Sequence, residues 1–509
     1  MHRLFKGALI VGLFNVIGLF MGFALNIILA SQFGSGSQMD CYLTAITVPI
    51  YIITILSGSL SVTFIPVFND NKDPAKRWTL FSSLAYISTL VGVLITMLLF
   101  VFSSEVIHFL SPAFSIEMVE YSASLLKAYS YIIFLTILNE ILSGVFYSYG
   151  YFIIPVINKI ISPVLILIVV LLLGKNVSIV DIIYANVVGT VVQNIILLWN
   201  FNRQKEFQFY FYTKIFTKEV LSVGKLILPL LAGAMFYKLL PVFDKYLLSH
   251  MPVGSVSSIG YSQKVFFALS QILSSLISMQ VFSYMSRLFS ENRMAELVNL
   301  ITKIINVIAF ITIPISTILI VFSYPMVELL YERGKFTIAD TEIVSLCLKL
   351  YLLSFPGVIL GTIISQGLYV LKDTKSPFIV GLIEVALYII LCRMLAKHFN
   401  IMSLPISYVV YFYFSVIILG IILQRKIKYL NSGEFVVKVL KFVLLILIIS
   451  LAGYAFSKYF DFSTVSQMIV ALICFLCYIT VSYMFGFDES RFLIDKIKYE
   501  LFAVFKKQR

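Results

Sequence analysis

Two lysines inside apolar segments are the strongest candidates in this sequence for binding a ligand. Lys238 lies in the segment 221–248 and Lys264 in the next one, 255–286. An ionised amine at membrane depth is costly and is retained chiefly for function, and a buried cation needs an anionic partner. The two lysines therefore predict a cavity that accepts a negatively charged group such as a pyrophosphate. Snorkelling to the membrane surface, or a structural ion pair, is the alternative.

Further polar groups share the apolar segments. Asp40 and Asp244 are predicted to complete the substrate-binding site, by pairing with the two lysines or by gating. Lys225 and Lys303 lie near the predicted cytoplasmic ends of their segments, where anchoring at the interface is the simpler interpretation. Four other residues are predicted to serve as gate or coupling groups for transport: Glu140, Glu384, Lys245 and Asn26.

No catalytic, metal or nucleotide motif accompanies these residues. The four histidines lack any metal-ligand spacing, and no glycine-rich loop of the nucleotide-binding type is present. Cys474 and Cys477 form a C-x-x-C inside an apolar segment, where small apolar residues are a simpler interpretation than a redox or metal site. The chain is therefore predicted not to be an enzyme and to need no cofactor. A transport activity would draw on a sodium or proton gradient or on the membrane potential.

The composition identifies the elements that position these residues. Hydrophobic residues make up 60% of the chain and charged residues 12%, against about 45–50% and about 25% in soluble domains. Because lipid offers no hydrogen bonds to the backbone, long apolar stretches predict helices and not open sheets. We predict an all-α integral membrane protein of about fourteen transmembrane helices, at 7–30, 42–68, 79–102, 121–148, 153–173, 179–200, 221–248, 255–286, 301–323, 342–371, 377–396, 402–423, 435–457 and 463–486.

The basic residues predict the orientation of these helices. Lysines and arginines cluster in both tails and in alternate loops, at 72–77, 203–218, 287–293, 372–375 and 425–428. The other loops have few, at Lys175, Arg333, Lys335, Lys397 and Lys458. This positive-inside pattern places both termini in the cytoplasm and requires an even helix count. It also assigns the net charge of +13 to topology and anionic lipids, and not to nucleic acid.

A weak internal repeat divides the chain. The triplet FSI at 114–116 resembles FTI at 336–338, an offset of 222 residues, and the same offset pairs Lys127 with Lys349 and Pro155 with Pro377. The step corresponds to six helices and keeps their orientation, which predicts two parallel-related six-helix lobes around a central cavity. The predicted parts are an N-terminal lobe at 1–200, a linker at 201–220, a C-terminal lobe at 221–424, two added helices at 425–486 and a basic cytoplasmic tail at 487–509.

Two local features refine this organisation. The linker alternates aromatic with basic residues, its aromatics being Phe207, Tyr210, Phe211 and Phe216. This pattern predicts an amphipathic stretch on the cytoplasmic leaflet, with a solvated loop as the alternative. Pro229 and Pro241 lie in the seventh predicted helix, which can therefore bend.

Several motifs together resemble a known family. The most specific are LYERGKFT at 330–337 and DTKSP at 373–377, which flank the tenth predicted helix. DK at 244–245 followed by GSVS at 254–257, and Gly34 followed by Asp40, extend the likeness. The chain resembles the MurJ/MviN lipid II flippases of the multidrug/oligosaccharidyl-lipid/polysaccharide exporter superfamily. The resemblance implies a fourteen-helix transporter that moves a lipid-linked saccharide.

The chain departs from this family at several charged positions. The family places arginines where this chain has Leu19 and Leu25, an acidic residue at Asn26, and a further arginine near Ile52 and Ile53. In the eighth helix Lys264 stands in place of an arginine. In the eleventh helix, where some members carry sodium ligands, this chain has Tyr388 and Cys392. Arginine grips a pyrophosphate through two parallel hydrogen bonds and lysine does not, so the substrate contacts are expected to differ.

The leading prediction is a monomeric flippase of the cytoplasmic membrane. It would move a polyprenyl-pyrophosphate-linked saccharide, lipid II or a related precursor, by alternating access. The alternative is a flippase of O-antigen, capsule or exopolysaccharide units. A drug or metabolite antiporter would favour an acidic cavity, whereas Lys238 and Lys264 make this one basic. A membrane glycosyltransferase or polymerase would need catalytic loops, and the outer loop 103–120 shows no recognisable motif.

Overall fold

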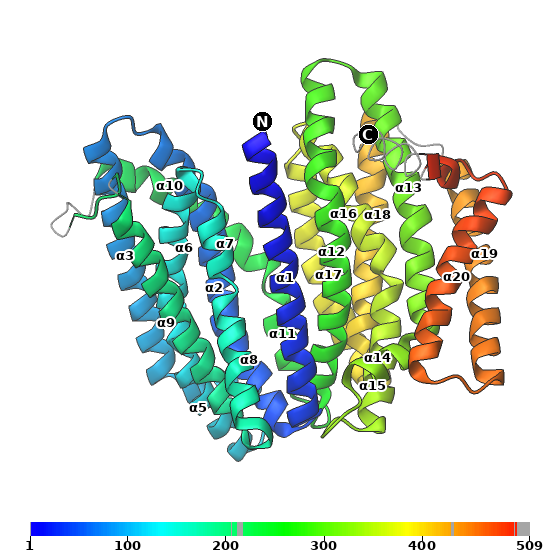
Figure 1. Ribbon diagram of the computed structural model, residues 1–509, viewed down its shortest axis with the longest axis horizontal. Helices are drawn as coiled ribbons and strands as arrows, with labels where there is room; N and C mark the ends of the chain where they lie inside the picture. Colours follow the sequence, from blue (N-terminus) through cyan, green and yellow to red (C-terminus); the bar gives the residue numbers. More distant parts are fainter. Residues whose placement is uncertain (1, 205, 211–216, 429–431, 493, 496–509) are drawn as a thin grey trace, which may run out of the picture. The chain divides into compact units, whose positions relative to one another are not determined.

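The computed structural model describes residues 2–204, 206–210, 217–428, 432–492 and 494–495. These described residues form helices and contain no strand (Figure 1). The chain folds into two compact units. Unit 1 comprises Met1–Gly260 with Gly334–Phe336, and unit 2 comprises Tyr261–Arg333 with Thr337–Arg509.

Unit 1 holds the first eleven α-helices and the first turns of the twelfth. Their bounds are α1 His2–Phe33, α2 Ser37–Asp70, α3 Pro74–Val101, α4 Ser103–Leu110, α5 Ile116–Ser130, α6 Ile132–Ser148, α7 Ile153–Asn158, α8 Ile161–Leu173, α9 Ile179–Arg203, α10 Lys218–Tyr237, α11 Leu240–Leu248 and α12 Ser255–Ser290. A short 3-10 helix, Gly174–Asn176, joins α8 to α9.

Unit 2 holds the rest of α12 and the remaining helices. Their bounds are α13 Met294–Val321, α14 Ser323–Tyr331, α15 Ile338–Leu353, α16 Phe355–Val370, α17 Lys375–Phe399, α18 Ser403–Ile427, α19 Ser432–Tyr459 and α20 Thr464–Met484. One apolar core of this unit joins α12, α13, α16 and α18. A second core joins α13 to α19 and α20, which run side by side in Figure 1.

The helices confirm the predicted class of all-α membrane protein. Twelve stretches of the described chain are long and apolar enough to cross a membrane. One of them, Lys375–Ile427, contains two helices, α17 and α18. The 36-residue α12 is a further helix of transmembrane length. When α17 and α18 are counted separately and α12 is added, each of the fourteen predicted segments corresponds to a helix or to a broken helix.

The order of the helices within each unit reflects the internal repeat. The 28-residue α3 is followed by the short α4, just as the 28-residue α13 is followed by the short α14. The packing partners also correspond: α6 packs on α3 and α9, and α16 packs on α13 and α18. The repeated triplets mark matching helix starts. Ser115 caps α5 by accepting a bond from the N–H of Met118, and Thr337 caps α15 through a capping box with Asp340.

The division into units does not follow the predicted linker at 201–220. Helix α10 packs along α2 and α3, and α11 packs on α2 and α4. These contacts attach the seventh transmembrane segment to unit 1, although the repeat assigns it to the second half of the sequence. The hydrophobic pattern alone does not reveal this attachment, because an apolar helix can pack equally well on either neighbour.

The linker prediction is wrong for Phe207. This residue is buried in unit 1, with its ring 4.9 Å from Tyr149, 5.1 Å from Phe201 and 5.5 Å from Trp78. It therefore packs on protein, where the amphipathic prediction had it face lipid. Tyr210 is half-buried, and its N–H donates to Ser82. The predicted interfacial residues Phe211 and Phe216 lie outside the described residues.

Candidate functional site

The seventh transmembrane segment is a broken helix, and Lys238 lies at the break (Figure 1). Pro241 occupies the first turn of α11; it has no N–H to donate to the carbonyl four residues earlier, so α10 ends at Tyr237. The side chain of Lys238 is exposed. The hydroxyl of Tyr51 on α2 donates to the carbonyl of Met235, 3.0 Å away, in the last turn before the break. Discontinuous helices are common at binding sites of transporters.

Asp40 is a buried carboxylate that caps α12. It lies in the first turn of α2 and is 1% exposed. Its two oxygens accept bonds from the N–H of Gly254 at 2.6 Å, the N–H of Ser257 at 2.7 Å and the hydroxyl of Ser257 at 2.7 Å. A helix start supplies unpaired N–H groups and a partial positive charge. Asp40 therefore ties the start of α2 to the start of α12 within unit 1.

The acid and base of the DK motif are both buried on α11. Asp244 is 6% exposed and Lys245 8% exposed. Burial of Asp244 and Lys245, as of Asp40, distinguishes them from the exposed Lys238.

Three glycines allow close backbone contacts between segments that meet near the start of α2. Gly34, Gly254 and Gly334 have φ angles of +63°, +92° and +62°, a region that favours glycine. The N–H of Lys335 donates to the carbonyl of Ser31 at 2.8 Å. A Cβ on Gly334 would overlap with that same carbonyl oxygen, and one on Gly34 would overlap with the carbonyl oxygen of Lys335. The segments around Gly34, Gly254 and Gly334, which belong to three of the motifs that carry the family resemblance, therefore meet here through close backbone contacts.

We expect Gly334→Ala to destabilise the protein at least twice as much as Gly150→Ala. Both glycines have positive φ, so both substitutions incur the left-handed penalty of about 1–2 kcal/mol. Only Gly334 lacks space for a Cβ, whereas nothing lies within 4 Å of one at Gly150. Overpacking adds about 1–3 kcal/mol. Thermal unfolding of the two purified variants measures the difference, and equal losses would contradict the close approach of Gly334 to Ser31.

Lys264 lies on α12 within unit 2, and its side chain is exposed. The neighbouring side chains hold this part of the helix in place. Gln263 donates to the hydroxyl of Tyr351 at 3.0 Å, and the ring of Phe266 lies 5.7 Å from that of Tyr351. The packed side of α12 is therefore rigid beside the exposed Lys264.

The predicted coupling residues have different surroundings. Glu384 on α17 is half-buried and hydrogen-bonds to Ser415 of α18. The described residues offer it no ion pair. Tyr388 and Cys392, one and two turns along the same helix, are buried in protein. Glu140 pairs with Lys159 at 3.6 Å, and the amide of Asn26 donates to the carbonyl of Gly22 in its own helix.

The DTKSP block forms a charged helix start, in which Asp373 lies between two candidate membrane spans. Asp373 accepts bonds from the N–H of Ser376 at 3.0 Å and from its hydroxyl at 2.7 Å, and it pairs with Lys426 at 3.1 Å. These contacts, chiefly the N–H of Ser376, lower the pKa of Asp373 from 3.8 to about 2. The carboxylate stabilises the fold above its unfolded pKa and loses that effect as the pH falls through about 2.

We expect Asp373→Asn to lower the thermal unfolding temperature by the same amount at about pH 8 and at about pH 5. Both pH values lie above the pKa of the carboxylate in the folded and in the unfolded chain, so its charge stays constant. The control is Asp461→Asn, which removes an exposed carboxylate. A difference that disappears between these two pH values would show that Asp373 has no lowered pKa.

The structure separates the predicted binding residues into two kinds. Lys238 and Lys264 are exposed, in unit 1 and unit 2 respectively. Asp40 does not pair with either of them, contrary to one of its predicted roles, because the backbone of α12 already occupies both its oxygens. A part in substrate binding for these residues stays a prediction. Sequence reasoning missed Tyr51, and it named Ser257 only as part of the GSVS motif without its contact to Asp40, since the partners of these residues lie 184 and 217 residues away.

Comparison with known proteins gives a consistent result. A family model described as lipid II flippase MurJ matches residues 29–473. Three relatives are each named probable lipid II flippase MurJ. The protein of Buchnera aphidicola subsp. Schizaphis graminum is 24% identical and covers 80% of each chain. The Vibrio cholerae protein is 23% identical and covers 80% of each chain. The Borreliella burgdorferi protein is 22% identical and covers 94% of this chain and 97% of its own.

Solved structures share the fold. A lipid II flippase MurJ in an inward closed conformation superposes with a TM-score of 0.77 at 21% identity, covering 94% of this chain and 99% of its own. An inward-facing multidrug transporter of the MATE family gives a TM-score of 0.69 at 13% identity, covering 82% and 96%. At these identities the structures show the fold alone. The family model, which covers most of the sequence, shows more: the chain belongs to the MurJ lipid II flippase family.

Proposed function

We propose that this protein translocates lipid II, a polyprenyl-pyrophosphate-linked saccharide, across the bacterial cytoplasmic membrane. The main support for this proposal is the family match over residues 29–473. It agrees with the names of the relatives and disfavours the alternative of an O-antigen or capsule flippase. The protein is a transporter of the membrane, with both termini in the cytoplasm by the positive-inside rule.

The exposed lysines supply the binding chemistry. An ammonium is a compact point charge that attracts phosphate without fixing its orientation. Lys238, at the break between α10 and α11, and Lys264, on α12, would each attract the pyrophosphate of the lipid. Apolar side chains of the helices would leave the polyprenyl tail in the bilayer. The broken seventh segment can bend, and hinge movement is one way in which a transporter changes between its open states.

Glu384 is our candidate for coupling to a proton gradient. It is a half-buried carboxyl in a membrane span, with Ser415 as its hydrogen-bond partner. The resemblance places sodium ligands at Tyr388 and Cys392, and neither side chain supplies the hard oxygen ligands, such as carboxylates, that this ion prefers. A protonatable group one turn away is therefore a better candidate than a bound sodium ion. The membrane potential is the alternative driving force.

Complementation of a strain depleted of its lipid II flippase tests the proposed function. We expect the full chain to restore growth and normal cell shape. A chain that inserts but fails to restore growth, yet restores surface polysaccharide to a strain lacking an O-antigen flippase, would favour the alternative. Translocation of labelled lipid II in proteoliposomes, with and without a proton gradient, then tests the role of Glu384 through Glu384→Gln.

A further inference from the structure

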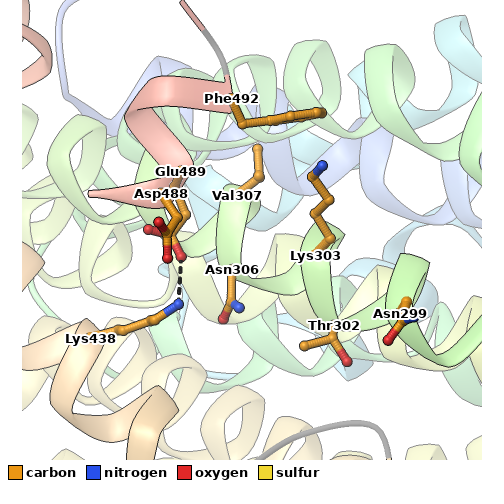
Figure 2. A pocket seen from close by; sticks show the side chains of 9 residues that line it. All are labelled: Asn299, Thr302, Lys303, Asn306, Val307, Lys438, Asp488, Glu489 and Phe492. Atoms are coloured by element: carbon orange, nitrogen blue, oxygen red, sulfur yellow. Dashed lines mark hydrogen bonds and ion pairs between the residues drawn. The ribbon is translucent and has the colours of Figure 1, made fainter. Parts of the chain in front are cut away.

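A cavity of about 210 Å³ in unit 2 holds two lysines that already have partners in the chain (Figure 2). It is lined by residues of α13, of α19 and of the segment that follows α20. Lys438 pairs with Glu489 at 3.0 Å, and the amine of Lys303 lies 3.6 Å from the ring centre of Phe492. These contacts join the segment after α20 to the two helices, so the lysines of this cavity serve the packing of the chain on itself.

The exposed side of α12 presents a lysine without such a partner. Lys264, Phe267 and Gln271 are exposed, Phe267 to 44%. Among the described residues Lys264 has no ion pair, and Gln271 has no hydrogen bond through its side chain. The other side of the same turns is buried, as Val265 and Phe266 show. The packed and the exposed sides of this part of α12 are therefore clearly separated.

The three exposed residues form one stripe along the helix. Steps of three and of four residues bring Lys264, Phe267 and Gln271 onto one face, with neighbouring Cβ atoms about 5–6 Å apart. A rise of about 1.5 Å for each residue places Gln271 about 10 Å from Lys264 along the helix axis. The exposed Ile272 lies about 100° away around the helix, outside this stripe.

The stripe is polar although α12 is long enough to cross a membrane. The helix is rich in serine and glutamine, and it is not among the twelve apolar stretches of the described chain. An amine or an amide that faced lipid would be costly. The exposed side chains of α20 show the difference, since Ile469, Leu472 and Leu476 are all apolar. We infer that the stripe faces water, where it is open to the polar part of a ligand.

The chemistry of the stripe changes from charge to hydrogen bonding along the helix. The amine of Lys264 attracts phosphate as a point charge. The amide of Gln271 has two N–H donors and an acceptor oxygen, which suit the hydroxyl and acetamido groups of a sugar. The face of the Phe267 ring carries partial negative charge, so it attracts the C–H groups of a sugar ring.

The aromatic ring of the stripe is held in place by its neighbours. The ring centre of Phe267 lies 5.4 Å from that of Phe266 and 6.3 Å from that of Tyr408, both with edge-on geometry. Phe266 in turn packs on Tyr351. An exposed ring that is already fixed loses little freedom when a ligand binds to it.

We propose that Phe267 and Gln271 bind the sugar next to the pyrophosphate of the transported lipid and so contribute to its selection. In a polyprenyl-pyrophosphate-linked saccharide this sugar is bonded directly to the phosphate. With the pyrophosphate at Lys264, the sugar lies along the stripe, against Phe267 and within reach of Gln271. The inference rests on the proposed function, because it takes the transported lipid to belong to this class.

Binding of three labelled lipids to the purified full chain tests the proposal. The lipids are lipid II, a polyprenyl pyrophosphate that carries a single N-acetylhexosamine, and bare polyprenyl pyrophosphate. We expect the unaltered chain to bind the two sugar-bearing lipids more tightly than the bare one. Gln271→Leu and Phe267→Leu are each expected to weaken binding of both sugar-bearing lipids by about 2- to 10-fold, as for loss of one neutral contact. Binding of the bare lipid is expected to stay unchanged, which also shows that each variant is folded.

Three further variants make the test specific. Phe267→Tyr keeps the aromatic ring and is expected to retain the affinity for sugar-bearing lipids. Lys264→Ala is expected to weaken binding of all three lipids, since each carries the pyrophosphate. Ile272→Ala is the matched control, because Ile272 is an exposed neighbour of Gln271 outside the stripe, and it is expected to bind all three lipids as the unaltered chain does.

Two results would overturn the inference while the proposed function stands. One is that Gln271→Leu and Phe267→Leu weaken binding of the bare lipid as much as that of the sugar-bearing lipids, or weaken neither. The other is an effect confined to lipid II, which would assign the two residues to its peptide or its second sugar. Failure of the unaltered chain to bind any of the three lipids would contradict the proposed function itself.

Discussion

Lys264→Ala is expected to abolish translocation of lipid II while the protein still inserts and folds. The side chain is exposed on α12, and the described residues offer it no ion pair, so its removal leaves no buried carboxylate without a partner. The resemblance implies that an arginine of the family occupies this position and contacts the substrate. A hydrogen bond to a charged group contributes about 1.5–3 kcal/mol, which corresponds to roughly a 10- to 150-fold loss in binding.

Lys264→Arg distinguishes charge from size at this position. An arginine restores the residue of the family and offers a two-point contact to the pyrophosphate, so this variant is expected to support growth at least as well as the unaltered chain. Lys225→Ala is the control for loss of one positive charge, because Lys225 is exposed on α10 near its predicted cytoplasmic end. Growth of the depletion strain and lipid II translocation in proteoliposomes are the measurements. Normal translocation by Lys264→Ala would remove Lys264 from the binding site.

The helices could be predicted from the sequence because their signal is local. An apolar stretch of about 20 residues has few alternatives to a transmembrane helix. The repeat was recognisable because it coincides with caps: Ser115 and Thr337 each accept a bond from the third residue of the following helix. Cap residues are short polar side chains with a defined partner, so their spacing persists where apolar residues interchange freely.

The contacts of the site could not be predicted because they join distant parts of the chain. Asp40 looked like a partner for a lysine, but its oxygens accept bonds from residues more than 210 positions away. Nothing in the local sequence of Asp40 distinguishes a cap of another helix from an ion pair. The packing of Phe207 could not be predicted for the same reason. An aromatic residue in a basic loop is equally compatible with the membrane interface and with the aromatic cluster around Trp78.

Asp40→Ala is expected to cause the largest loss of stability of any substitution considered. The change leaves the N–H groups of Gly254 and Ser257 without their acceptor at a buried helix start. Leaving a buried donor without its acceptor costs about 1–3 kcal/mol for each group, and the loss for two donors is a large part of the net stability of a typical fold. A lower yield of folded protein and a lower unfolding temperature are the measurements.

Two further variants separate a structural role of Asp40 from a direct role in binding. Asp40→Asn keeps one acceptor oxygen but points an N–H₂ group at a donor, so an intermediate loss of stability is expected. Asp70→Ala removes an exposed carboxylate at the other end of the same helix and is expected to have little effect. An Asp40→Ala protein as stable as the Asp70→Ala protein, yet unable to translocate lipid II, would show that Asp40 acts on the substrate. Because Asp40 joins the start of α2 to the start of α12, we expect stability and translocation to be lost together.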